Sequence, residues 1–322
     1  MEALYGRALL EWPLLLASAA TFGTATFVLA VRGFDGCPAG STMAALLPAW
    51  RLMAIVVFLV SPIMLLKLTA EMSGVSWLEA LPFVPEVLTQ THSGEVWRWA
   101  LIVAALLLVC VFAPLASITR AVALACFSAV LMFCGAQLGH AVDHGSMAIL
   151  VYLVHEAAAG TWIGALLGLW VVTRRAQPSW EWVARAARMV STIAAWSVAA
   201  LVLSGAYTAY QGLGFSVDRL LFSSYGRTLI VKVVVFCAVL SIGAYNRERL
   251  MPDVAASGTQ RILLRNVGIE ALALGVMVVG LAALLANTPP ARGHMMSHPG
   301  MAMDTLYSPV TGNRRASTEL EP

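Results

Sequence analysis

Charged residues are scarce in this chain. Asp, Glu, Lys and Arg together make up 11% of its 322 residues, whereas about 25% is typical of a soluble domain. Apolar residues account for 60%, which is the composition of a protein that crosses a membrane several times. The net charge of +3 is small and spread over several loops, so the composition gives no reason to expect a nucleic-acid partner.

Several common motifs are also missing. None of the five cysteines forms a CxxC pair, which favours small core side chains over a disulfide framework. The sequence has no internal repeat and no phosphate-binding glycine loop or nucleotide motif, so we do not expect an ATP-driven pump. Our leading expectation is a protein that is not an enzyme. The first apolar run, Leu9–Val31, is longer than the core of a signal peptide and carries Glu11 and Pro13 near its start. We expect it to be retained as a helix.

Eight apolar runs are long enough to cross a bilayer, which takes about 20 helical residues. They are Leu9–Val31, Trp50–Leu68, Trp97–Leu115, Ala121–Leu138, Met147–Val172, Met189–Tyr210, Thr228–Tyr245 and Val267–Ala286. The sequence therefore predicts an all-α fold, with a bundle of eight transmembrane helices over residues 1–286. Between the third and fourth helices, only Ala116–Arg120 remains as a turn.

The distribution of arginine predicts the orientation. Four arginines follow the fifth run and four follow the seventh: Arg174, Arg175, Arg185, Arg188, Arg247, Arg249, Arg261 and Arg265. Loops rich in Lys and Arg face the cytoplasm. Both termini then face outside, which is the periplasm if the protein lies in a bacterial inner membrane.

The longest predicted connection, Thr69–Val96, lies on the outside as well. It contains the apolar side chains of Trp77, Leu78, Leu81 and Phe83. They can lie at the membrane surface, or the connection can pack as an ordered loop over the bundle.

Three of the six histidines gather between Gly139 and Trp170. If a helix begins near His144, then His144, His155 and Trp162 share one face, with His155 about 16 Å deeper at 1.5 Å per residue. An ionisable side chain inside hydrocarbon costs several kcal/mol unless it is paired or faces a cavity, so it marks a candidate functional site. We therefore take His140, His144, Met147 and His155 as candidate metal ligands. The alternatives are a neutral, hydrogen-bonded His155 and two solvated loop histidines.

Glu156 lies about 100° around the same helix, in line with Gly160, Gly164 and Gly168. Small residues at this spacing let another helix approach closely, so we expect helix packing on this face and a buried Glu156. Lys232, in the seventh run, is its expected ion-pair partner. Glu270 lies about one turn into the last run and is expected to pair with a loop arginine, for which Arg265 is the candidate.

The C-terminal segment 287–322 is polar, and we expect it to be a disordered external tail. It combines imidazole and thioether groups in His294, Met295, Met296, His298, Met301 and Met303. Thioether sulfur favours Cu(I) and imidazole serves Cu(II). The tail is therefore a candidate copper-collecting segment, although chance enrichment is the simpler alternative.

A series of different short motifs runs along most of the chain. They are TxxGxxW from Thr91, GHA from Gly139, HEAAAGTWIGALLGLW from His155, SGAYTAY from Ser204, SYGRTLIVK from Ser224, NR at Asn246, LLRNVGIEALALG around Glu270 and the closing NTPP. In these features, over roughly residues 50–290, the chain resembles the copper resistance protein D family of bacterial membrane proteins. The resemblance implies copper handling or transport at the inner membrane, and it supports His140 and His155 as the metal-handling histidines.

Three functions remain open from the sequence. The leading hypothesis is a copper permease in the lipid bilayer that takes Cu(I) or Cu(II), with a periplasmic copper-binding protein as a further partner. The second is a membrane oxidoreductase with b-type haem, although such haem needs two histidines at matched depth and only His155 lies well inside an apolar run. The third is an assembly subunit that transports nothing itself.

Overall fold

A computed structural model describes residues 2–139, 145–252 and 257–288. Every regular element in these ranges is helical, and eight helices are long and apolar enough to cross a membrane. The predicted all-α fold with eight membrane-spanning helices is therefore confirmed.

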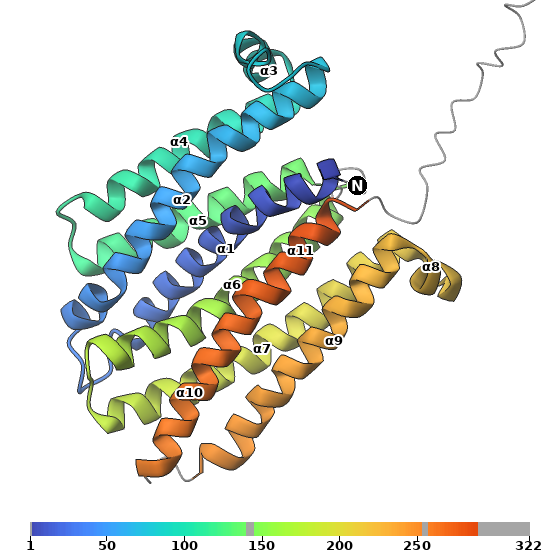
Figure 1. The fold of residues 1–322 in the computed structure, drawn as a ribbon. Helices are drawn as coiled ribbons and strands as arrows, with labels where there is room; N and C mark the ends of the chain where they lie inside the picture. The colour runs from blue at the N-terminus through green and yellow to red at the C-terminus, as the bar shows by residue number, and fades with distance from the viewer. Residues whose placement is uncertain (1, 140–144, 253–256, 289–322) are drawn as a thin grey trace, which may run out of the picture. The chain divides into compact units, whose positions relative to one another are not determined.

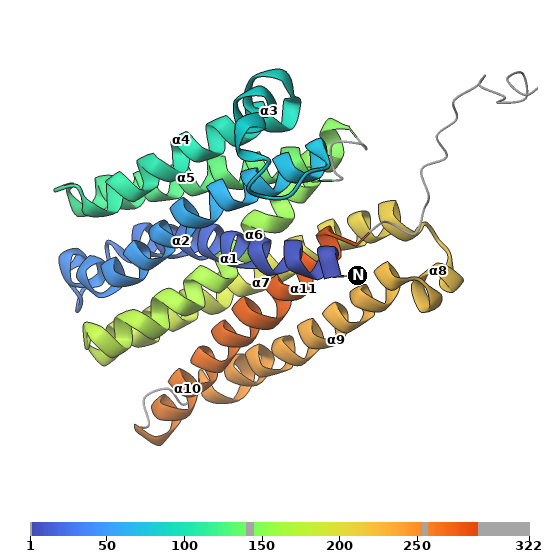
Figure 2. The same ribbon diagram turned by 45° about the horizontal axis from the view of Figure 1, so that its top comes forward.

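Seven of the spans are single α-helices: α1 (Glu2–Val31), α2 (Ala39–Ser73), α4 (His92–Phe112), α5 (Ser117–Leu138), α6 (Ser146–Arg175), α7 (Trp180–Leu213) and α9 (Ser224–Tyr245). A π-helical turn over Asn246–Leu250 continues α9. The eighth consists of α10 (Ser257–Ala273), a π-helical turn (Leu274–Val278) and α11 (Val279–Ala286). Short helices α3 (Val84–Gln90) and α8 (Val217–Phe222) lie in two connections. The long helices run side by side in alternating directions, so α3, α8 and the start of α1 lie at one end (Figures 1 and 2). We call it the α3/α8 end.

Helix α1 is central and contacts α2, α5, α6 and α11. Its closest partner is the glycine series of α6. Gly164 faces Gly23 so closely that an added Cβ would lie 2.1 Å from the Gly23 carbonyl carbon, and Gly168 lies against the Phe27 ring. The predicted close approach on this face is thus made by α1, which the sequence does not identify as the partner. We call this contact the α1/α6 seam.

The turn between α4 and α5 comes earlier than the sequence predicts, at Ala113–Ala116 rather than Ala116–Arg120. Arg120 belongs to α5, and its guanidinium donates hydrogen bonds to the carbonyls of Cys110 at 3.3 Å and Ala113 at 2.6 Å. The last carbonyls of a helix lack partners within it. Arg120 supplies hydrogen-bond donors to carbonyls at this helix end, so α4 can end before Pro114.

The connection from α2 to α4 leaves its four apolar side chains exposed, by 41% to 80% in Trp77, Leu78, Leu81 and Phe83. The same connection also packs against the bundle, because Ala80 is buried and Val87 of α3 belongs to the hydrophobic core. Contact of the four exposed side chains with the membrane surface stays a prediction. Trp77 and Leu78 lie within a local turn, in which the Glu79 carboxylate accepts hydrogen bonds from the Ser76 hydroxyl at 2.7 Å and from its backbone N–H at 3.1 Å. These bonds lower the pKa of Glu79.

Candidate functional site

His155 on α6 meets Ser204 on α7. His155 lies nine residues after the start of α6 at Ser146, and Ser204 lies nine residues before the end of α7 at Leu213. Because the two helices are antiparallel neighbours, both residues lie about 14 Å from the α3/α8 end of their helices at 1.5 Å per residue. The distance from His155 Nδ1 to Ser204 Oγ is 2.9 Å.

The hydrogen-bond partners of Ser204 define the state of the ring. The Ser204 hydroxyl also lies 2.5 Å from the carbonyl oxygen of Ala200, to which it donates. A hydroxyl carries one proton, so Ser204 must accept from Nδ1–H of His155. In the neutral imidazole, Nε2 is then unprotonated and has a lone pair to offer a metal. An Nδ1–H held by a second residue is the usual arrangement of a metal-binding histidine.

Glu156 has a different neighbour from the one expected. Among the described residues, Glu156 forms no ion pair with Lys232, and its Oε2 atom is buried without a hydrogen-bond partner. Glu156 lies one turn before Gly160, on the side of α6 that packs against α1. The expected pair is therefore corrected: the glycine face turns Glu156 towards α1, not towards α9.

The α1/α6 seam ends in polar residues. Gly160 of α6 lies against Ala19 of α1. Eight residues earlier in each of these parallel helices are Tyr152 and Glu11, so the register predicts that these two residues face each other. The Glu11 carboxylate accepts a hydrogen bond from the side-chain amide of Asn287, just after α11. The Glu11 carboxylate and the Tyr152 phenol are thus expected beside the α1-facing side of α6, which is next to the face that carries His155.

A second buried polar group lies deeper, around Glu270. Its carboxylate accepts hydrogen bonds from Trp162 Nε1 at 3.2 Å and Asn246 Nδ2 at 3.4 Å, and Asn266 donates to Asn246 at 2.9 Å. Arg265 is exposed and, within the described residues, forms no ion pair with Glu270. The expected pair is corrected, because neutral donors from α6 and from the π-helical turn after α9 contact this carboxylate instead.

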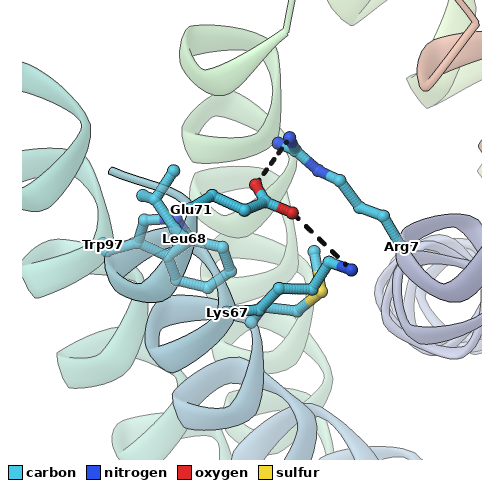
Figure 3. A pocket seen from close by; sticks show the side chains of 6 residues that line it. Arg7, Lys67, Leu68, Glu71 and Trp97 are labelled. Carbon is cyan, nitrogen blue, oxygen red and sulfur yellow. Dashed lines mark hydrogen bonds and ion pairs between the residues drawn. The ribbon is translucent and has the colours of Figure 1, made fainter. Parts of the chain in front are cut away.

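A cluster at the α3/α8 end joins α1 to α2 (Figure 3). The Glu71 carboxylate lies 3.4 Å from Arg7 and 3.6 Å from Lys67, beside a cavity of about 10 Å³ that Trp97 also lines. The spacing of Lys67 and Glu71, four residues apart in a helix, is a signal that sequence reasoning can use. The contribution of Arg7 depends on the packing of α1 and has no such signal.

The other predicted ligands do not join His155 in the described part of the chain. Met147 is 60% exposed in the first turn of α6, about 12 Å along the helix from His155. His140 and His144 lie outside the described residues, as do His294, Met295, Met296, His298, Met301 and Met303. Within the described ranges no group of three or more His, Cys, Asp or Glu can hold a metal ion. His92, the other described histidine, is the first residue of α4, so these ranges hold no histidine pair at matched depth for haem.

Eight apolar helices around a histidine–serine contact and buried carboxylates define a multi-pass membrane protein. Comparison with known proteins identifies the family of membrane proteins to which this chain belongs. The family model of copper resistance protein D matches residues 184–285, and that of the copper resistance protein D-like N-terminal domain matches residues 1–149. The chain belongs to the copper resistance protein D family, as the sequence motifs indicate, and the matches begin before residue 50.

Copper resistance protein D of Pseudomonas syringae pv. tomato is 29% identical to this chain over 256 residues, which cover 74% of this chain and 82% of that protein. No solved structure matches. The family makes this chain a copper-related membrane protein.

Proposed function

We propose that this chain moves copper ions across the bacterial inner membrane, with His155 as the deepest ligand. The observation that carries the proposal is the hydrogen bond from His155 Nδ1 to Ser204, which leaves Nε2 available for a soft or borderline metal. Membership of the copper resistance protein D family supports copper as that metal.

The proposed path uses few ligands at each step. Transport needs sites that bind well enough to capture an ion and weakly enough to release it, and one imidazole with transient partners meets this requirement. His140 and His144 supply the next ligands from the connection before α6, with Met147 at the start of that helix. The tail from His294 to Met303 collects copper on the outside, which is the periplasmic side given by the arginine-rich loops.

Copper uptake into proteoliposomes tests the proposal, with Cu(I) and Cu(II) supplied separately. We expect His155→Ala to reduce the initial rate at least about tenfold, the lower range for disturbing the surroundings of a metal ligand. His92→Ala is the matched control, because His92 is exposed at the start of α4, and it should keep the wild-type rate. Equal rates for wild type and His155→Ala would remove His155 from the path.

A cellular experiment separates transport from an assembly role. Cells with His155→Ala or His140→Ala should lose the copper phenotype at normal protein levels. Deletion of the residues after Arg292 should change only the copper concentration required. Wild-type copper tolerance in both histidine variants, together with its loss in cells that lack the protein, would favour an assembly subunit.

A further inference from the structure

An apolar groove of about 440 Å³ opens between α7 and α9 near the α3/α8 end. Its volume falls within the range of about 300–1,000 Å³ typical of small-molecule sites. The apolar lining includes Ala206, Ala209 and Leu213 of α7, Phe215 just after it, and Ile230 and Val234 of α9.

The groove exists because α9 is loosely packed at the edge of the bundle (Figures 1 and 2). Only Gly226 and Val239 of α9 are buried. The helices touch at the α8 end, where Gly212 lies against the Tyr225 ring. Next to this contact, the small side chains of Ala206 and Ala209 leave the space between the helices unfilled.

Two arginines mark the outer end of the groove. Arg227 precedes the lining residues Ile230 and Val234 by three and seven residues on α9, so all three share one helix face. The Arg219 guanidinium donates to the carbonyl oxygen of Leu213, another lining residue, at 3.4 Å. Both arginines are exposed, and neither forms an ion pair within the described residues.

The same end has the apolar surface of a membrane interface. Phe215 is 94% exposed and its ring lies 4.8 Å from that of Tyr210. Phe222 on α8 is 75% exposed and Val217 is 67% exposed. Tyr210 lies at this end as well, and tyrosine is enriched at the headgroup level of membranes, so we expect both arginines to lie near the lipid phosphates.

We propose that this groove is a phospholipid site in which one acyl chain lies between α7 and α9 and the phosphate binds Arg219 and Arg227. The apolar lining matches a hydrocarbon chain, and arginine forms paired, charge-assisted hydrogen bonds with phosphate. The site does not depend on the proposed copper transport. The groove does lie beside the His155–Ser204 contact. Ala206 follows Ser204 by two residues, and a Cβ added to Gly205 would lie 3.5 Å from His155 Cε1.

Native mass spectrometry of the full-length protein from mild detergent tests this site. The wild type should retain a phospholipid, and the Arg219→Gln, Arg227→Gln double variant should retain at least about tenfold less, since several hydrogen bonds to a charged group are lost. Ala209→Trp should also displace the lipid by filling the groove. The controls are Arg98→Gln, an exposed arginine at the same end, and Ala238→Trp, on the exposed face of α9 outside the groove; both should retain it.

Thermal unfolding of delipidated protein gives a second measurement that does not require the variants to fold. Phosphatidylglycerol and phosphatidylcholine should both raise the Tm, whereas diacylglycerol, which lacks the phosphate, should not. Equal stabilisation by diacylglycerol, or equal lipid retention in all variants, would overturn the site. A dimer that Ala209→Trp converts to monomer would show that a second copy of the chain fills the groove instead.

Discussion

Gly164 of α6 and Gly23 of α1 lie backbone to backbone, with no room for a side chain on either residue. A Cβ on Gly164 would lie 2.1 Å from the Gly23 carbonyl carbon, and one on Gly23 would lie 1.9 Å from the Gly160 carbonyl oxygen. Lipid tails are as apolar as leucine, so close van der Waals contact of this kind holds helices together in a bilayer.

Gly164→Ala should therefore destabilise the protein by about 1–3 kcal/mol, the usual range for overpacking. Gly135→Ala in α5 is the matched control, because nothing lies within 4 Å of the added Cβ. It should be neutral or slightly stabilising, since alanine favours helix over glycine. Thermal unfolding in detergent compares the two, and an equal Tm would contradict the seam.

Ser204→Ala should lower copper uptake about 10–100-fold, the effect typical of removing the residue that orients a metal ligand. The expected loss comes from a free His155 ring rather than from misfolding. Ser241→Ala is the control, because Ser241 also donates to the carbonyl four residues earlier, in Cys237, at 2.9 Å but is exposed on α9. Uptake that is equally reduced in both variants would point to a general helix effect.

Glu270→Leu should destabilise the bundle, because it leaves the side-chain donors of Trp162 and Asn246 without their acceptor. Each buried unsatisfied donor costs about 1–3 kcal/mol. Glu270→Gln keeps one acceptor oxygen and should lose less. Arg265→Gln should leave the Tm unchanged. A drop in Tm with Arg265→Gln as large as that with Glu270→Leu would restore the ion pair that the sequence suggests.

Glu71→Gln should change stability by less than about 1 kcal/mol, because its pairs with Arg7 and Lys67 are partly exposed and screened by salt. Glu95→Gln, which removes the exposed pair with Arg98, gives the comparison. Unfolding at low and high salt should separate them: any loss in Glu71→Gln shrinks as salt rises. A loss of several kcal/mol that salt does not change would mean that the cluster is buried in the membrane-embedded protein.

The sequence predicts the helices well because hydropathy over 20 residues directly reports the length of apolar chain that a bilayer requires. Helix ends are less well predicted. Helix α2 extends from Ala39 to Ser73, well beyond the predicted Trp50–Leu68, because helical hydrogen bonding continues outside the hydrocarbon.

The identity of the neighbours is the part that the sequence leaves out. The four-residue spacing from Glu156 to Gly168 predicts a close helix contact, yet it carries no information on which helix makes it. The wrong partner for Glu156 follows from choosing Lys232 by depth alone. Ser204 is missed for a similar reason, since a serine in an apolar run has no signal until the fold places it beside His155.

The α1/α6 seam also has a consequence for biosynthesis. Helix α1 leaves the ribosome before its glycine-matched partner, which begins at Ser146 and follows three further spanning helices. Until then, the bare backbone at Gly23 has no α6 to cover it. We therefore expect chains truncated before α6 to be recognised by membrane quality-control proteases, and chains that extend through Arg175 to be the first to escape degradation.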